Sequence, residues 1–179
     1  MEPTVFQQVL RAPFFSMPDA VRALHSIRGR GEYAGRASIE RGKGPLAWLC
    51  ATCAGLPPRM RDAPTRVEFI ADARREIWKR DFGGRRMSSK LYCRDGLLCE
   101  RLGPVQFRYE LHIHEGTVYW NVARVRLFGL LPLPARLFNG VQCREREHQG
   151  RYEFRVEAAL PLVGPLIRYE GWLQPADGG

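Results

Sequence analysis

Two proline-rich apolar loops adjoin stretches in which polar and apolar residues alternate, and this combination constrains the fold more than any other feature of the chain. The loops are 127–135 (LFGLLPLPA) and 158–167 (AALPLVGPLI). Alternation with a period of two is typical of half-buried β-strands, and proline stops a hydrogen-bonded ladder from continuing. The pattern predicts an antiparallel sheet whose apolar loops gather at one edge or mouth.

Glycine-containing turns divide the remainder of the chain into short strands. Asp95-Gly96, Glu115-Gly116, Asn139-Gly140 and Gln149-Gly150 supply the positive φ that tight hairpins require. An extended segment is expected at 33–40, and strands at 66–73, 76–82, 86–93, 97–102, 107–114, 117–128, 141–148, 151–159 and 166–173. Because each strand follows the last after a short turn, the predicted sheet is an antiparallel meander.

Helices are predicted only in the first third of the chain. Residues 3–10 place apolar side chains on one side, a second helix starts at Ser16, and a third is opened by Pro45 and closed by Gly55. We therefore expect an α+β fold. It consists mostly of an antiparallel β meander, as a curved sheet or incomplete barrel, with two or three short helices in the N-terminal third.

The phase of the alternation predicts which side chains face the core. In 107–114 the odd positions are apolar, so His112 and His114 are expected to point away from the core. In 151–158 the even positions, from Tyr152 onward, face inward. Glu145 and Glu147 lie in a strand that is polar on both faces, which predicts an exposed edge protected by its charges.

Some strands carry polar side chains in the inward phase, and these residues form the candidate site. Arg80 shares a phase with Trp78, and Glu100 shares one with Leu98. Buried charge is costly unless paired, so Arg80 and Glu100 are expected to meet inside. The candidate ligand-binding residues are Trp78, Arg80, Ser89, Glu100, Tyr109, Tyr119 and Asn121. The alternative is that this phase faces solvent, or that the pair only ties neighbouring strands together.

Composition favours one globular domain spanning residues 1–179. The chain is 45% hydrophobic and 26% charged, near globular averages. Its longest uncharged stretch, 44–58, is shorter than the ~20 apolar residues that cross a bilayer. The N-terminus lacks the pattern of a secretory signal, so a cytoplasmic location is expected.

A formal net charge of +9 invites a nucleic-acid interpretation, but acidic residues are interleaved with the basic ones and no nucleic-acid-binding motif is evident. Nucleic acid is therefore not expected as a partner. A basic face flanked by apolar loops also fits contact with anionic lipid, provided that those loops are exposed.

The five cysteines and four histidines predict neither a disulfide framework nor a metal site. Cys50 and Cys53 form a C-x-x-C, but no second pair accompanies them, and both share a helical face with Leu46 and Leu49. Core packing is the expected role of these two thiols. No cofactor is expected, since the chain lacks a G-x-G-x-x-G after a strand.

The sequence resembles an uncharacterised bacterial domain family known only as a domain of unknown function. The segments that carry the resemblance span nearly the whole chain: MPDAVRALH, GRASIERGKGPLAWL, GLPP, GLLCERLGPVQF, RLFGLLPLPARL and LPLVGPLIRYEGWLQP. In that family the domain occurs alone or fused behind NAD(P)-binding proteins similar to saccharopine dehydrogenase. The resemblance implies either an oxidoreductase partner or a shared place in small-molecule metabolism, and it assigns no catalytic residues.

Three functions remain open from the sequence. The first is a non-catalytic module that binds an apolar or amphipathic small molecule inside the sheet. The second is a cofactor-free cyclase or isomerase that uses the carboxylate of Glu100 beside Arg80. The third is an interaction domain that docks on an oxidoreductase through Leu131 and Leu133.

Overall fold

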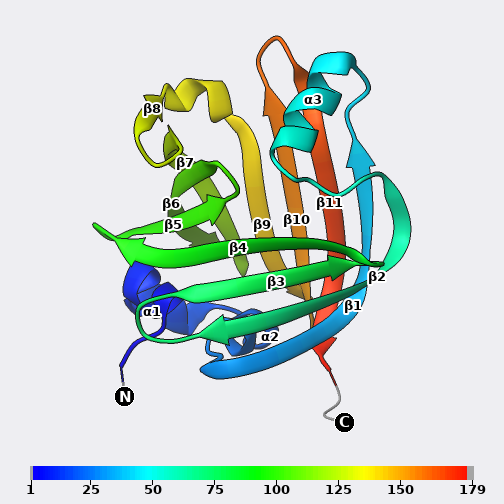
Figure 1. Cartoon of the computed structure of the whole chain (residues 1–179). Coiled ribbons are helices and arrows are strands. Elements are labelled where there is room, and N and C mark those ends of the chain that lie inside the picture. The colour runs from blue at the N-terminus through cyan, green and yellow to red at the C-terminus, as the bar shows by residue number, and fades with distance from the viewer. Residues whose placement is uncertain (1, 177–179) are drawn as a thin grey trace.

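The computed structural model describes residues 2–176 as a sheet of eleven strands accompanied by short helices (Figure 1). The helices are α1 (Val5–Leu10), η1 (Ala12–Ser16), α2 (Asp19–Leu24), α3 (Pro45–Cys53) and η2 (Ala135–Phe138). The strands are β1 (Gly29–Arg41), β2 (Met60–Ala71), β3 (Glu76–Phe82), β4 (Arg85–Arg94), β5 (Leu97–Leu102), β6 (Val105–His114), β7 (Thr117–Leu127), β8 (Leu131–Leu133), β9 (Gly140–His148), β10 (Arg151–Leu160) and β11 (Gly164–Pro175). None of the described helices is long and apolar enough to cross a membrane.

The sheet closes into a barrel. Strands β1 to β7 pair in chain order, β7 pairs with β9, and β9 to β11 continue the meander until β11 meets β1. Every pairing is antiparallel, and β8 is a short addition beside β7. The prediction of a mostly antiparallel meander with few N-terminal helices is confirmed, and the curved sheet forms a complete ring of strands.

The seam between the first and last strands depends on two glycines. A Cβ atom on Gly35 would lie 1.9 Å from the carbonyl oxygen of Trp172, and one on Gly171 would lie 2.2 Å from that of Arg36. Real Cβ contacts are never so short, so the backbones of β1 and β11 approach closely only because both positions lack a side chain.

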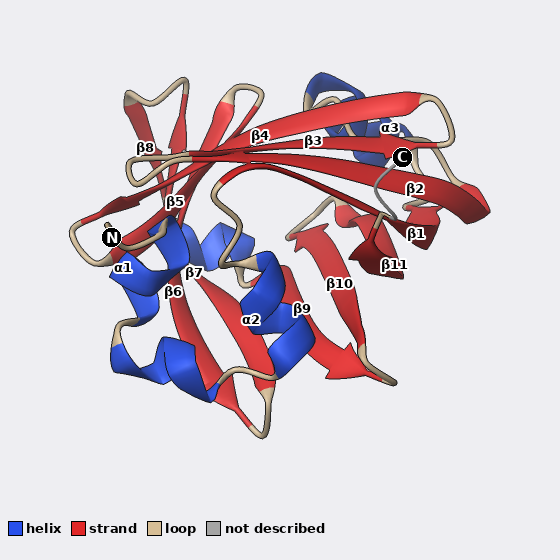
Figure 2. Cartoon of the chain, turned by 90° about the horizontal axis from the view of Figure 1, so that it is seen from below, coloured by secondary structure: helices blue, strands red, loops and turns tan. Residues whose placement is uncertain are grey.

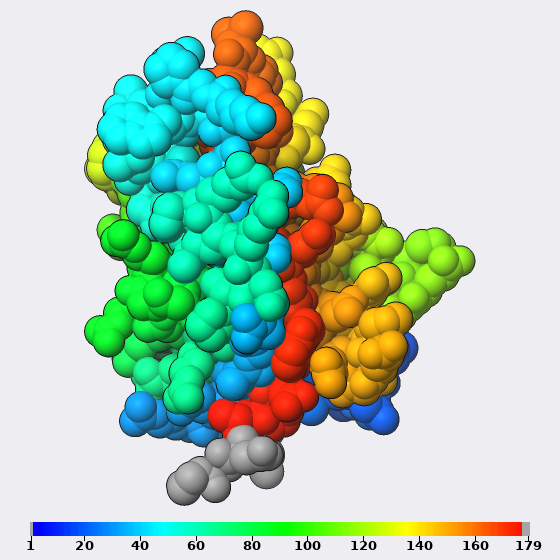
Figure 3. All heavy atoms as spheres, turned by 90° about the vertical axis from the view of Figure 1, so that its right-hand side faces the viewer, coloured from blue at the N-terminus to red at the C-terminus, as the bar shows by residue number. Residues whose placement is uncertain are grey.

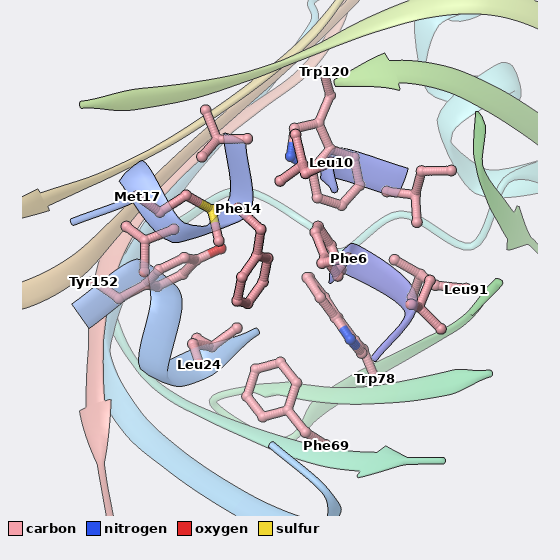
Figure 4. Packing of buried hydrophobic residues seen from close by; sticks show 14 of the residues in the cluster. Phe6, Leu10, Phe14, Met17, Leu24, Phe69, Trp78, Leu91, Trp120 and Tyr152 are labelled. Atoms are coloured by element: carbon pink, nitrogen blue, oxygen red, sulfur yellow. The ribbon is translucent and has the colours of Figure 1, made fainter. Parts of the chain in front are cut away.

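The N-terminal helices close one end of the barrel, as Figure 2 shows from below. A capping box starts α1: the Thr4 hydroxyl accepts a hydrogen bond from the Gln7 amide at 3.3 Å, and the Gln7 side chain accepts one from the Thr4 amide at 2.8 Å. Phe6, Phe14 and Leu24 are buried against the inner faces of the strands (Figure 4). Burial of such large side chains, worth about 2 kcal/mol each, fixes these short helices.

The opposite end carries α3 and both proline-rich loops, as the sequence predicts. In Figure 3, α3 (cyan) and the β10–β11 turn (orange) stand at the top of the molecule. The face that α3 buries differs from the prediction. Ala47 and Ala51 face the barrel, whereas Leu46 and Leu49 are exposed, Cys53 is exposed and Cys50 is half-buried. The smaller alanines let α3 pack close to β11, which leaves its larger side chains outward.

Candidate functional site

A small cavity lies inside the barrel, among aromatic side chains and a few polar ones. Its volume is about 60 Å³, and its walls include the predicted residues Trp78, Arg80, Glu100 and Tyr109. A cavity of ~150 Å³ holds benzene, and pockets for larger ligands measure ~300–1,000 Å³. The cavity therefore has room for a few water molecules or a compact group, and a long alkyl chain does not fit unless lining side chains move.

Arg80 is the cation of this cavity. It lies on β3 in the same phase as Trp78 and Phe82, and its guanidinium carbon is 4.9 Å from the centre of the Trp78 ring. Nη1 donates a hydrogen bond to the Ser89 hydroxyl at 2.8 Å, which is the role the structure gives to the predicted residue Ser89. The cation–π contact and this hydrogen bond hold the guanidinium over the indole ring.

Glu100 faces Arg80 across the cavity with a loose contact. The distance from Arg80 Nη2 to Glu100 Oε1 is 3.6 Å, too long for a hydrogen bond, although both side chains are nearly buried. Among residues 2–176 no side chain or amide donates a hydrogen bond to this carboxylate. The predicted internal ion pair is present, and it retains hydrogen-bonding capacity on both partners.

A second buried carboxylate, Glu145, is fully engaged. Its Oε2 lies 2.8 Å from His25 Nε2, and its Oε1 accepts a hydrogen bond from the Tyr152 hydroxyl at 2.7 Å. His25 follows α2 and its ring stacks on Phe6 with centroids 3.6 Å apart. Glu145 therefore ties the N-terminal helices to β9 and β10 through charge-assisted hydrogen bonds.

The prediction that Glu145 and Glu147 mark an exposed edge is wrong. Strand β9 pairs on both sides, with β10 and with β7, so it has no free edge. Glu145 is 1% exposed, and Glu147 accepts a hydrogen bond from the Ala20 amide at 2.7 Å. Both carboxylates hold α2 in place, and their charges do not protect an edge.

Glu76 is a third buried carboxylate near the same helices. The Trp78 indole donates a hydrogen bond to its Oε2 at 3.0 Å, while its Oε1 is buried without a partner among the described residues. Burial raises the pKa of Glu76, and the nearby His25 opposes part of that rise.

Burial also acts on the hydroxyl and thiol groups that face the cavity. Burial raises the pKa values of Tyr109, Cys143 and Tyr152 well above their ordinary range, so these groups stay protonated.

Tyr119 and Asn121 lie on the outer face of the barrel, contrary to their predicted inward orientation. Tyr119 stacks on His112, and the Asn121 amide is 3.3 Å from the same ring. The cause is a β-bulge: Arg108 pairs with Arg124 and Tyr109 with Val122, so Ala123 has no partner. This extra residue reverses the phase of β7, and Trp120 faces inward in place of its neighbours.

The structure adds His25, Glu145 and Tyr152 to the polar centre that the sequence predicts. The inward phase of Tyr152 is visible in the sequence, and Glu145 pairs with Phe154 in the neighbouring strand. The signal for Glu145 is obscured because β9 carries charges on both faces. Among residues 2–176, no three His, Cys, Asp or Glu side chains come together in an arrangement that would hold a metal ion.

Fold and site together define a class: an antiparallel β-barrel closed at one end by helices, with a small cavity and buried charges inside. Within that class the chain belongs to the family described as "Domain of unknown function (DUF4166)", whose model matches residues 17–173. No curated protein matches the chain. Among solved structures, Rv2717c from M. tuberculosis has a TM-score of 0.46 and 14% identity, over 90% of this chain and 99% of that one.

Proposed function

We propose that this barrel is a non-catalytic module that binds a compact small molecule, with an apolar body and one polar end, in its interior cavity. The observation that carries the proposal is the Arg80–Glu100 pair. Two nearly buried charges 3.6 Å apart face a cavity and retain unused donors and acceptors. Buried polar groups are normally satisfied, so a guest that both accepts from Arg80 and donates to Glu100 would complete this pair.

The chemistry of the walls defines the class of guest. A primary amide, a protonated carboxylic acid or an alcohol offers an acceptor and a donor on one small group. The aromatic rings of Trp78, Tyr109 and Trp120 would cover its apolar body. The volume of about 60 Å³ favours a short body over the long chain of a lipid. The oxidoreductase partner and the fusion implied by the family resemblance remain predictions, as does the cytoplasmic location.

A series of primary amides tests both the polar end and the size. Acetamide, benzamide and palmitamide would be titrated into the protein while tryptophan fluorescence is recorded, since Trp78 and Trp120 line the cavity. We expect acetamide to quench or shift the emission, and benzamide, which is larger than benzene, and palmitamide to have no effect. Native mass spectrometry of gently purified protein would show whether a small molecule is already bound.

The matched variant removes both charges at once. Arg80→Met with Glu100→Leu replaces a buried pair by apolar groups of similar size, a change that is often neutral for stability. We expect amide affinity to fall about tenfold or more, which corresponds to ~1.4 kcal/mol. Arg146→Met with Glu153→Leu removes a pair on the outer face, 2.8 Å apart, and is the control. Equal affinities in all three proteins, or no response to any amide, would refute the proposal.

Glu100 in a cavity beside Arg80 also suits the cofactor-free cyclase or isomerase. Glu100→Gln separates the two functions because the amide keeps the size of the side chain but cannot act as a base. A catalyst would lose turnover and retain its substrate, whereas a binding module has no turnover to lose.

A further inference from the structure

The end of the barrel opposite α1 and α2 carries nearly all of the exposed large hydrophobic side chains. We call this set the apolar crown. Its members lie on α3, around β8, on η2 and in the β10–β11 turn: Leu46, Trp48, Leu49, Phe128, Leu130, Leu131, Leu137 and Leu162. Among the described residues only Phe15, near the helical end, is a comparably exposed hydrophobic residue elsewhere. Monomeric proteins rarely gather so much apolar surface without a partner.

Charge separates the two ends of the barrel in the same way. The segments at the crown end, 41–61, 83–86, 102–105, 127–140 and 160–164, contain no acidic residue. Their basic residues are Arg41, Lys43, Arg59, Arg61, Arg85, Arg86 and Arg136. At the opposite end, each turn between β2 and β7 includes an acid: Asp72, Asp95 and Glu115. The crown is therefore both apolar and cationic.

Arg41 adds a further positive charge at the crown end. It is the last residue of β1, and its Nε and Nη2 atoms are buried without a hydrogen-bond partner among residues 2–176. The loops around it contain no acid that would neutralise this charge. Because these atoms are buried, Arg41 contributes to the attraction of anions through its charge and not through direct contact with a headgroup.

We propose that the apolar crown docks the protein on anionic lipid bilayers. Leucine, phenylalanine and tryptophan side chains would enter the interfacial region, and the surrounding arginines and Lys43 would contact headgroup phosphates. Trp48 is 62% exposed and is of the residue type that favours the level of the headgroups. A protein partner with basic residues would need acids on this surface to pair with, and the crown segments contain none. The proposal goes beyond ligand binding in the cavity and does not depend on it.

Cosedimentation with vesicles tests the docking surface directly. The full chain would be mixed with vesicles of phosphatidylcholine alone, or with about 30% phosphatidylserine. We expect the protein to pellet with the mixed vesicles, to bind phosphatidylcholine alone at least about tenfold more weakly, and to be released at high salt. A protein that stays in the supernatant with both would overturn the proposal.

Two variants with matched controls assign the binding to the crown. Trp48→Ser with Leu130→Ser removes side chains that are 62% and 84% exposed, so the fold should be retained, and Phe15→Ser, 69% exposed, is the control. Lys43→Gln, Arg85→Gln and Arg136→Gln remove charge at the crown; Arg28→Gln, Arg74→Gln and Arg94→Gln remove the same charge near the other end. We expect each crown variant to lose about tenfold or more in vesicle binding, and each control less than threefold.

Light scattering tests the alternative that a second copy of the chain, and not a bilayer, covers the crown. The wild-type chain could self-associate through the crown, and the Trp48→Ser, Leu130→Ser double variant would then be monomeric. If that is observed and neither the wild-type chain nor the variant binds vesicles, the membrane assignment is refuted. Equal losses of vesicle binding in the crown variants and their controls would also refute it, because binding would then not reside on the crown.

Discussion

Single hydroxyl and thiol groups decide how the barrel interior responds to pH. Tyr109, Tyr152 and Cys143 hold their protons more tightly in the folded chain than in the unfolded chain, because burial disfavours the charged forms. Their folded pKa values lie above the unfolded ones, so the stability linked to them is fully present below the unfolded pKa values. It is lost as pH rises beyond about 8.5 to 10, where the unfolded chain releases these protons first.

We predict that the free energy of unfolding falls as pH rises from about 9 to 11, by up to ~1.4 kcal/mol per pH unit for each proton retained. Tyr152→Phe should lower stability near neutral pH by about 1–3 kcal/mol, because Glu145 Oε1 loses its donor. The same variant should show a shallower alkaline slope. Urea unfolding at a series of pH values would measure both, with Tyr119→Phe on the outer face as the control. Identical slopes in Tyr152→Phe and the wild-type chain would contradict this assignment.

At the scale of single elements, strand phase was predictable wherever the alternation ran unbroken. Residues 151–158 and 107–114 show their inward faces directly. The strands of Arg80 and Glu100 carry polar residues in the inward phase, and both side chains line the cavity because they share that phase with Trp78 and Leu98.

In β7 the bulge at Ala123 changes the phase, and the sequence records it, because the apolar residues move from even positions before Ala123 to odd positions after it. The inward orientation predicted for Tyr119 and Asn121 carried the phase of Val125 back across this change. Glu145 could not be recognised because its partner His25 comes from a helix 120 positions earlier in the chain.

Deletion of Ala123 tests the role of the bulge. Trp120 and Val125 are five positions apart, and both face inward only because Ala123 is an extra residue in the strand. After the deletion they are four positions apart, so a regular β7 keeps both side chains inside. We therefore expect native-like tryptophan emission and a loss of stability below about 3 kcal/mol, caused by the changed local twist of β7. Deletion of both Val122 and Ala123 leaves Trp120 and Val125 three positions apart, on opposite faces, and should cost about 3 kcal/mol or more with red-shifted emission. Ala123→Ser keeps the bulge and should change stability by less than about 1 kcal/mol. Red-shifted emission after deletion of Ala123 alone would contradict this account.

At the scale of the whole molecule, the closure of the ring was beyond reach of the sequence. Each hairpin carries its own turn signal, but the pairing of β1 with β11 joins segments more than a hundred residues apart and has no local signature. The structure shows that this pairing requires Gly35 and Gly171, where the backbones of β1 and β11 lie too close for a side chain. The sequence did predict that the two proline-rich loops lie at the same end of the sheet. The chain reverses direction at each hairpin, so every second turn of a meander lies at the same end.

Gly171→Ala should weaken this seam more than an ordinary turn substitution. The new methyl group would meet the Arg36 carbonyl, so β1 and β11 must separate. We expect the free energy of unfolding to fall by ~3 kcal/mol or more. Gly96→Ala is the control: its φ is +75° but the space around it is open, and strain alone should cost about 1–2 kcal/mol. Denaturant unfolding compares the two. Equal losses would show that the seam adjusts without separating.

The same seam sets the order of events while the chain is being made. Strand β1 is made before the other strands of the barrel, yet one of its two partners is β11, the last of them. Until β11 has been made, that side of β1 presents unpaired amide and carbonyl groups, a known template for mispairing. Long-range closure of this kind is slow, so nascent chains halted before β11 should be the species that most need a chaperone.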